Sequence, residues 1–129
     1  MTREKQIQIA ALSGALAVGL GAFGAHGLKS ILERNQALDI WETAVFYHFV
    51  HTLVLLWLSG QEKLGAGPRY CFLLGTLIFS GTLYCLSLSG VRWLGAITPI
   101  GGTALIVGWL WLFLSHFGKN GASHKEPKG

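Results

Sequence analysis

Four long apolar stretches constrain the fold of this chain more than any other feature of its sequence. All ten Lys and Arg residues lie outside them, and the stretches cover residues 7–28, 40–59, 70–89 and 95–117. Each is long enough to cross the ~30 Å hydrocarbon core of a bilayer as a helix that rises about 1.5 Å per residue. Only 12% of the residues are charged, whereas a soluble domain carries about 25%. The sequence therefore predicts an all-α membrane protein.

The segments between these stretches predict the arrangement of the helices. Short connections favour antiparallel neighbours, so we expect an antiparallel four-transmembrane-helix bundle that forms a single integral membrane domain over residues 1–129. Residues 28–38 mix apolar and charged side chains, which is typical of a short outer amphipathic segment on the membrane surface. Thr98 and Pro99 fit an N-cap followed by proline at the first helical position, and this favours a later start of the fourth helix. Residues 118–129 are expected to form a polar C-terminal tail.

The distribution of basic residues predicts how the chain is oriented. The tails and the second connection hold Arg3, Lys5, Lys63, Arg69, Lys119, Lys125 and Lys128, whereas the other connections hold only Lys29, Arg34 and Arg92. The positive-inside rule therefore predicts a multi-pass protein of the bacterial inner (plasma) membrane with both termini in the cytoplasm. The sequence pI is about 9.3, but the charges form no continuous basic stripe, so we expect no nucleic acid partner.

Glycines at helical spacing surround a histidine at the end of the first stretch, where Gly21, Gly24 and Gly27 flank His26. In lipid, small residues let helix backbones approach closely. We therefore expect helix packing at Gly14, Gly21, Gly24, Gly101 and Gly108.

His26 and Glu42 are candidate polar groups at helix ends. Two interpretations of His26 stay open: its imidazole caps the unpaired carbonyls of the first helix, or it serves a polar pathway by pairing with Glu42 or with the outer segment around Trp93. Asp39 and Glu42 have the spacing of a capping box in which Asp39 is the N-cap. This pattern favours a capping role for Glu42 over a proton-carrying role.

Polar side chains follow one face of the second helix and one face of the third. At about 100° per residue, the faces gather Tyr47, His48, His51, Thr52 and Ser59 on the second helix and Thr76, Ser80, Tyr84 and Ser87 on the third. The depth of each side chain follows from the number of helical residues between it and the outer end of its helix. These depths predict one polar cluster in the outer half of the bundle, near Gly21 and Gly108. Its lining residues are Tyr47, His48, His51, Ser80 and Tyr84. Such a cluster either holds the helices together through hydrogen bonds or forms a site for a ligand, a proton or an ion.

Metal and disulfide chemistry have little support in the sequence. His48 and His51 have a spacing that can bind metal, but no third ligand is predicted beside them, so we expect no metal and no cofactor. Cys71 and Cys85 lie about 21 Å apart along one helix and cannot bridge each other.

The sequence contains no nucleophile elbow, P-loop, dinucleotide fingerprint or HExxH motif. We therefore expect a non-enzymatic membrane protein that binds a lipid, a small molecule or a partner protein. The alternative is a small transporter or proton/ion pathway through the polar cluster, and a metal or haem redox protein is a third hypothesis. The expected partners are the lipid bilayer and either a second copy of the chain or another membrane protein.

Four segments spread along the chain resemble a known family, namely residues 21–26, 41–52, 79–86 and 97–102. They resemble the small four-span bacterial membrane proteins of the YgdD and YwdK kind, whose relatives also occur in eukaryotes. The resemblance implies a multi-pass inner or plasma membrane protein without an assigned activity, and it supplies no catalytic residue. Tyr47 and His51 fit the family pattern more firmly than His48 and Glu42.

Overall fold

The computed structural model describes residues 1–117, and the predicted polar tail at residues 118–129 lies outside this range. The described part of the chain is helical and contains no strand. It forms α1 (Arg3–Ala25), α2 (Lys29–Arg34), α3 (Leu38–Leu58), η1 (Glu62–Leu64), α4 (Gly67–Ser89), η2 (Arg92–Ala96) and α5 (Thr98–Phe117), of which η1 and η2 are short 3₁₀ helices. The all-α prediction is therefore confirmed over residues 1–117.

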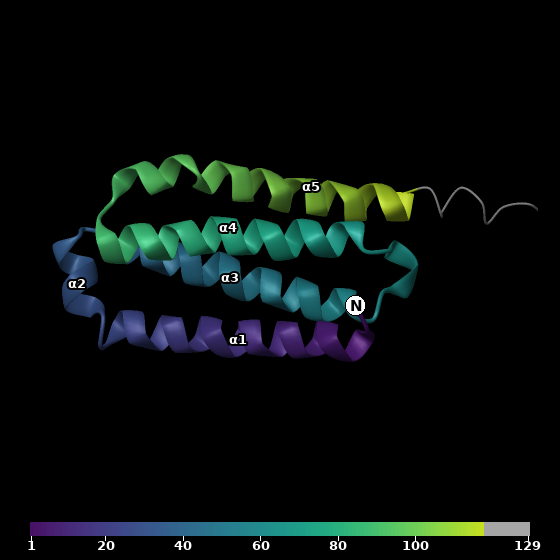
Figure 1. Cartoon of the computed structure of the whole chain (residues 1–129), viewed down its shortest axis with the longest axis horizontal. Helices are drawn as coiled ribbons and strands as arrows, with labels where there is room; N and C mark the ends of the chain where they lie inside the picture. Colours follow the sequence, from purple (N-terminus) through teal and green to yellow (C-terminus); the bar gives the residue numbers. More distant parts are fainter. Residues whose placement is uncertain (118–129) are drawn as a thin grey trace, which may run out of the picture.

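The four long helices lie side by side along the long axis of the molecule (Figure 1). α3 packs against α1 and α4, and α5 packs against α4. α2 and η2 lie at one end, the α2 end, whereas the N-terminus and η1 lie at the other, the η1 end (Figure 1). The apolar core lies towards the η1 end around Phe72, where it includes Leu55, Leu58, Leu105 and Leu112.

A hydrogen-bonded clasp ties α2 to the end of α4. The side-chain amide of Asn35 donates to the carbonyls of Ser87 at 2.9 Å and Leu88 at 3.0 Å. Arg92 in turn donates to the Asn35 carbonyl at 3.1 Å. The clasp satisfies two carbonyls of the last turn of α4, which have no partner within the helix.

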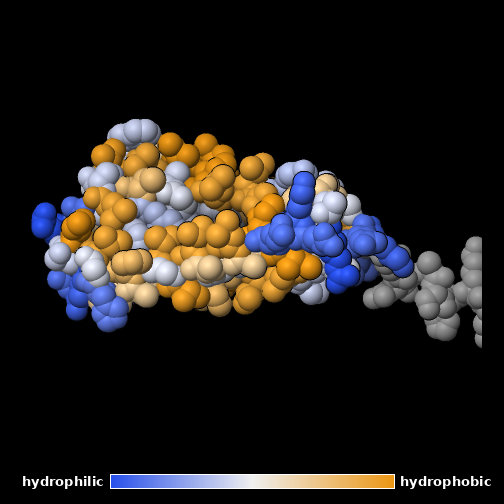
Figure 2. All heavy atoms as spheres, turned by 60° about the horizontal axis from the view of Figure 1, so that its bottom comes forward, coloured by the Kyte–Doolittle hydropathy of each residue, from blue (hydrophilic) through white to orange (hydrophobic). Residues whose placement is uncertain are grey.

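Three helical segments of the described chain are long and apolar enough to cross a membrane, namely α1, α4 and Arg92–Phe117. α3 is not among them, because Asp39, Glu42, His48 and His51 lower its mean hydropathy. Figure 2 shows apolar side chains over the middle of the molecule and hydrophilic side chains at both ends. This distribution matches a helical membrane protein.

The helix ends differ from the prediction mainly at α3. This helix begins at Leu38 with Ala37 as its N-cap, and no side chain bonds the cap. The predicted capping box of Asp39 and Glu42 is therefore wrong, since Asp39 already lies inside the first turn. The start of α5 at Thr98, preceded by η2, agrees with the late start predicted for the fourth helix.

Two glycines mark the closest helix contacts. A Cβ atom at Gly24 of α1 would collide with the indole of Trp41, and one at Gly101 of α5 would collide with the backbone of Phe79 on α4. The other predicted packing glycines are less tightly enclosed. A Cβ would lie 3.5 Å from Thr52 at Gly14, 3.3 Å from Val45 at Gly21 and 3.0 Å from Phe72 at Gly108.

Candidate functional site

A chain of four polar side chains links α1, α3 and α4 in the middle of the molecule. The Tyr84 hydroxyl is 3.0 Å from Nδ1 of His48, and Nε2 of His48 is 3.0 Å from Oγ of Ser13. Oγ of Ser13 is 2.6 Å from Oγ1 of Thr52. The chain is half-buried and joins three helices through hydrogen bonds.

The partners of His48 leave its tautomer free. A hydroxyl group can both donate and accept a hydrogen bond, and both ring nitrogens of His48 face hydroxyls. Rotation of the hydroxyls of Tyr84 and Ser13 therefore lets the imidazole proton sit on either nitrogen. This is the one property of the cluster that could support proton movement.

His51 has a different environment from His48. Its Nδ1–H donates to the carbonyl of Tyr47 at 2.7 Å, and Nε2 accepts from the indole N–H of Trp109 at 3.2 Å. A carbonyl only accepts and an indole N–H only donates, so these two bonds select one neutral tautomer. The ring is 5% exposed and stacks on Tyr47 and Phe72 with centroid distances of 5.9 and 5.8 Å. His51 is therefore fixed in an aromatic environment beside α5.

The other two residues of the predicted cluster serve helix packing. Ser80 is buried, and its hydroxyl donates to the carbonyl of Ala44 at 2.9 Å, which ties α4 to α3. Tyr47 packs on Phe79 with a centroid distance of 4.4 Å. The five residues thus lie in two environments: His48, Ser80 and Tyr84 lie at the space between α1 and α4, whereas Tyr47 and His51 lie with the aromatic side chains of α4 and α5.

A groove between α1 and α4 exposes the first of these environments. This α1–α4 groove has a volume of about 350 Å³. Its apolar walls include Leu12, Leu16, Leu73 and Leu77. The polar residues that line it are Ser13, His48, Thr76, Ser80 and Tyr84. The volume lies at the lower end of the range of about 300–1,000 Å³ that small-molecule sites occupy.

Thr76 is the unsatisfied polar group of the α1–α4 groove. The residue is 6% exposed, and its hydroxyl has no hydrogen-bonding partner among residues 1–117. A threonine inside a helix commonly bonds the carbonyl four residues earlier, as Thr82 does with Ile78 at 2.7 Å. A buried hydroxyl without a partner costs about 1–3 kcal/mol, so Thr76 has an unused hydrogen-bonding position beside the groove.

Sequence reasoning missed Ser13 and left Thr76 out of the cluster. Ser13 is surrounded by alanine and glycine residues, which indicated only close packing. Thr76 does lie on the predicted polar face of the third helix. Ser13 is the sole hydroxyl residue between residues 7 and 25. A single polar side chain in an apolar helix is the sequence feature that could have indicated its role.

His48 and His51 do not converge on a common point for a metal. The ring nitrogens of His48 contact side chains of α1 and α4, whereas one nitrogen of His51 contacts α5. Within residues 1–117, no three His, Cys, Asp or Glu side chains form a metal-binding group. Cys71 and Cys85 are free thiols.

His26 and Glu42 do not pair with each other in the described chain. His26 is the C-cap of α1, and its backbone N–H donates to the Phe23 carbonyl at 3.2 Å. Gly21 and Gly24 do not interrupt α1, which continues to Ala25, and Gly27 lies in the turn that follows it. Glu42 is exposed and lines a second groove, between α1 and α3.

Comparison with known proteins gives the family. A family model described as a protein of unknown function, DUF423, matches residues 20–102. The chain belongs to the DUF423 family. A UPF0382 membrane protein of Staphylococcus haemolyticus is 44% identical over 115 residues, which cover 86% of this chain and 93% of the relative. The UPF0382 membrane protein YwdK of Bacillus subtilis is 39% identical, covering 84% of this chain and 93% of the relative.

The family extends to eukaryotes. A UPF0382 membrane protein of Schizosaccharomyces pombe is 40% identical over 110 residues, which cover 78% of this chain and 92% of the relative. No solved structure matches the chain. The matched DUF423 region includes the end of α1 and the whole of α3 and α4. It therefore includes His48, Thr76 and Tyr84 of the α1–α4 groove, whereas Ser13 lies before it.

Proposed function

We propose that this DUF423 protein binds an amphiphilic ligand, a lipid or a small apolar molecule with a polar head, in the α1–α4 groove. One observation carries the proposal: the groove has leucine walls and a polar lining in which the buried Thr76 hydroxyl lacks a partner. Apolar walls with a few placed polar groups are the usual composition of a ligand site. The activity proposed is binding without catalysis.

The ligand suited to this groove has a neutral, hydrogen-bonding head. Thr76, Ser13 and Tyr84 supply hydroxyls, and no Asp, Glu, Lys or Arg lines the groove. A hydroxyl or carbonyl head can bond Thr76 without the cost of burying an unpaired charge. An alkyl or isoprenoid body can then lie against Leu12, Leu16 and Leu77.

The proposed setting is the inner membrane, with all four long helices spanning it as an antiparallel bundle. α3 has 21 residues, which is about 32 Å of helix, and it lies between α1 and α4. The ring nitrogens of its histidines have hydrogen-bonding partners on these neighbours, on α5 and within α3, which lowers the cost of placing them in the membrane. The chain doubles back at each short connection (Figure 1).

The positive-inside rule orients the proposed bundle. The η1 end carries Arg3, Lys5, Lys63 and Arg69, and the α2 end carries Lys29, Arg34 and Arg92. The excess at the η1 end favours a cytoplasmic N-terminus. With four spans, the C-terminus then lies on the same side.

Photocrosslinking tests the proposed ligand site. The probe is an oleoyl monoglyceride with a diazirine in its chain, and the protein is reconstituted in lipid nanodiscs. We expect crosslinks on α1 residues 9–20 and α4 residues 73–84, and about a fivefold loss of them in Thr76→Val, which removes one hydrogen bond. Thr103→Val is the matched control, because Thr103 is exposed on α5 away from the groove. Equal labelling of the wild type and Thr76→Val would refute the proposal.

A proton pathway is the second candidate, and the reversible chain from Tyr84 through His48 to Ser13 and Thr52 favours it. Within residues 1–117, however, no hydrogen bond continues from the Thr52 hydroxyl to a polar group at the η1 end. Proton conduction and ligand binding alone can be distinguished in proteoliposomes that contain a pH-sensitive dye. The rate at which their interior acidifies is measured after acid is added outside. Faster acidification with the wild type than with His48→Phe would support conduction, whereas equal rates would favour binding alone.

A further inference from the structure

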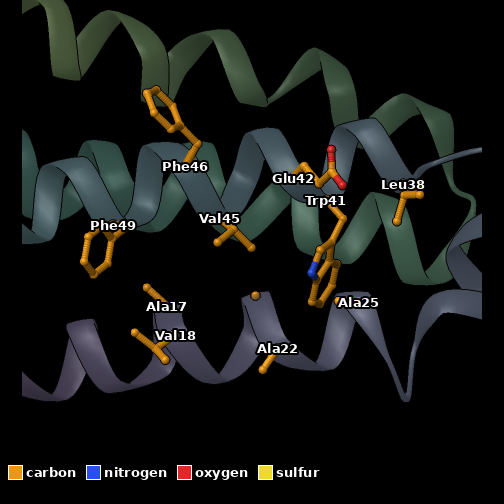
Figure 3. A pocket seen from close by; sticks show the side chains of 12 residues that line it. Ala17, Val18, Ala22, Ala25, Leu38, Trp41, Glu42, Val45, Phe46 and Phe49 are labelled. Carbon is orange, nitrogen blue, oxygen red and sulfur yellow. The ribbon is translucent and has the colours of Figure 1, made fainter.

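A second groove, the α1–α3 groove, lies on the other side of the contact between α1 and α3. It has a volume of about 530 Å³. Figure 3 shows Ala17, Val18 and Ala22 of α1 across from Val45 and Phe49 of α3. None of these residues lines the α1–α4 groove. The two grooves are therefore separate sites.

The size of the residues explains why this groove stays open. α1 contributes small residues, which are Ala17, Gly21, Ala22, Gly24 and Ala25, whereas α3 contributes larger ones. Trp41 closes the groove near the α2 end, where its buried indole donates to the Leu20 carbonyl at 2.9 Å (Figure 3). Large side chains on one helix meet small ones on the other, and space remains beside the contact.

One acidic side chain lines this apolar groove. Glu42 is its sole Asp, Glu, Lys, Arg or His residue; it is exposed, and it forms no ion pair among residues 1–117. Of the three cations at the α2 end, Lys29 lies 3.9 Å from Glu33 and Arg92 bonds Asn35, whereas Arg34 is exposed and forms no ion pair with Glu42. A carboxylate beside hydrocarbon is unfavourable without a cation or water.

We propose that the α1–α3 groove binds a bilayer lipid with a primary-amine headgroup. The ammonium group pairs with Glu42 and supplies up to three hydrogen-bond donors. One acyl chain lies in the groove beside Ala22, Val45 and Phe49. Glu42 and Phe49 are two helical turns apart, about 10 Å, so the charged head and the apolar body of one lipid reach both ends of the groove.

Native mass spectrometry tests this site. The protein is released from nanodiscs made of equal parts phosphatidylethanolamine and phosphatidylglycerol, and the retained lipids are weighed. We expect the wild type to retain phosphatidylethanolamine preferentially and Glu42→Gln to lose that preference by up to about fivefold, as for one exposed ion pair. Asp39→Asn is the matched control, because Asp39 is an exposed acid in the same helical turn that does not line the groove.

A second pair of variants tests the apolar part of the site. Ala22→Leu fills the groove, whereas Ala15→Leu adds the same volume at an exposed α1 position that lines neither groove. We expect only Ala22→Leu to release the lipid, and Thr76→Val to leave it bound, which separates this site from the α1–α4 groove. Equal retention of both lipids by the wild type would overturn the proposal. Dimers that dissociate in Ala22→Leu without lipid loss would also overturn it, because a second copy would then occupy the groove.

Discussion

Replacement of Gly24 by alanine tests the contact that joins α1 to α3. A Cβ at this position would overlap the indole of Trp41, which is 2% exposed and bonded to Leu20. The indole therefore has no room to move without leaving its site. We expect Gly24→Ala to separate α1 from α3 near the α2 end and to break the bond from the indole N–H to the Leu20 carbonyl.

The expected magnitude follows from three contributions. Overpacking of a close contact costs about 1–3 kcal/mol, and a buried N–H left without its partner costs about 1–3 kcal/mol. Alanine is better than glycine inside a helix by about 1 kcal/mol, which offsets part of the loss. At the middle of these ranges the net effect is a destabilisation of about 3 kcal/mol, or roughly 150-fold in the folding equilibrium.

Unfolding in mixed micelles with increasing SDS, followed by circular dichroism, measures this change. Gly19→Ala is the control, because a Cβ at Gly19 of the same helix meets nothing within 4 Å. We expect Gly19→Ala to match or exceed the wild-type stability. If Gly24→Ala unfolds at the same SDS fraction as Gly19→Ala, the proposed role of the Trp41 contact is refuted.

Three further predictions concern other parts of the molecule. Gly101→Ala should destabilise the protein by at least about 2 kcal/mol in the same SDS titration, since its Cβ would meet the α4 backbone, which cannot rotate away as a side chain can. Asn35→Ala should remove the clasp and raise hydrogen exchange in α2 and η2 by about tenfold, corresponding to the loss of about 1–2 kcal/mol of hydrogen bonding, while the centre of α3 stays protected. In spheroplasts, a membrane-impermeant maleimide should label Lys29→Cys and leave Lys63→Cys unlabelled; the reverse pattern would contradict the proposed orientation.

The sequence predicts the helices well because their signals are local. Apolar length identifies α1, α4 and α5, and the Thr98–Pro99 pair locates the start of α5. The capping box at Asp39 fails because the turn after α2 sets where α3 begins. The turn after α2 brings the Ala37 N–H within 2.9 Å of the Leu32 carbonyl, and α3 then starts at Leu38.

The candidate site is harder to predict because it depends on which helix each face meets. His48 and His51 point only about 60° apart around α3, and the sequence therefore groups them. The position of α5 separates them, since Trp109 approaches His51 whereas Ser13 and Tyr84 approach His48. The angular position of a residue on one helix does not determine which neighbouring helix its side chain contacts.

The position of α1 predicts a thermodynamic link between the two proposed binding sites. Among the long helices, α1 packs mainly on α3, and one groove lies on each side of that contact. A ligand that tilts α1 while filling one groove changes the width of the other. Linkage is reciprocal, so the two occupants must alter each other's affinity by the same factor. The lipid composition of the bilayer would then set the ligand affinity of the protein without any contact between lipid and ligand.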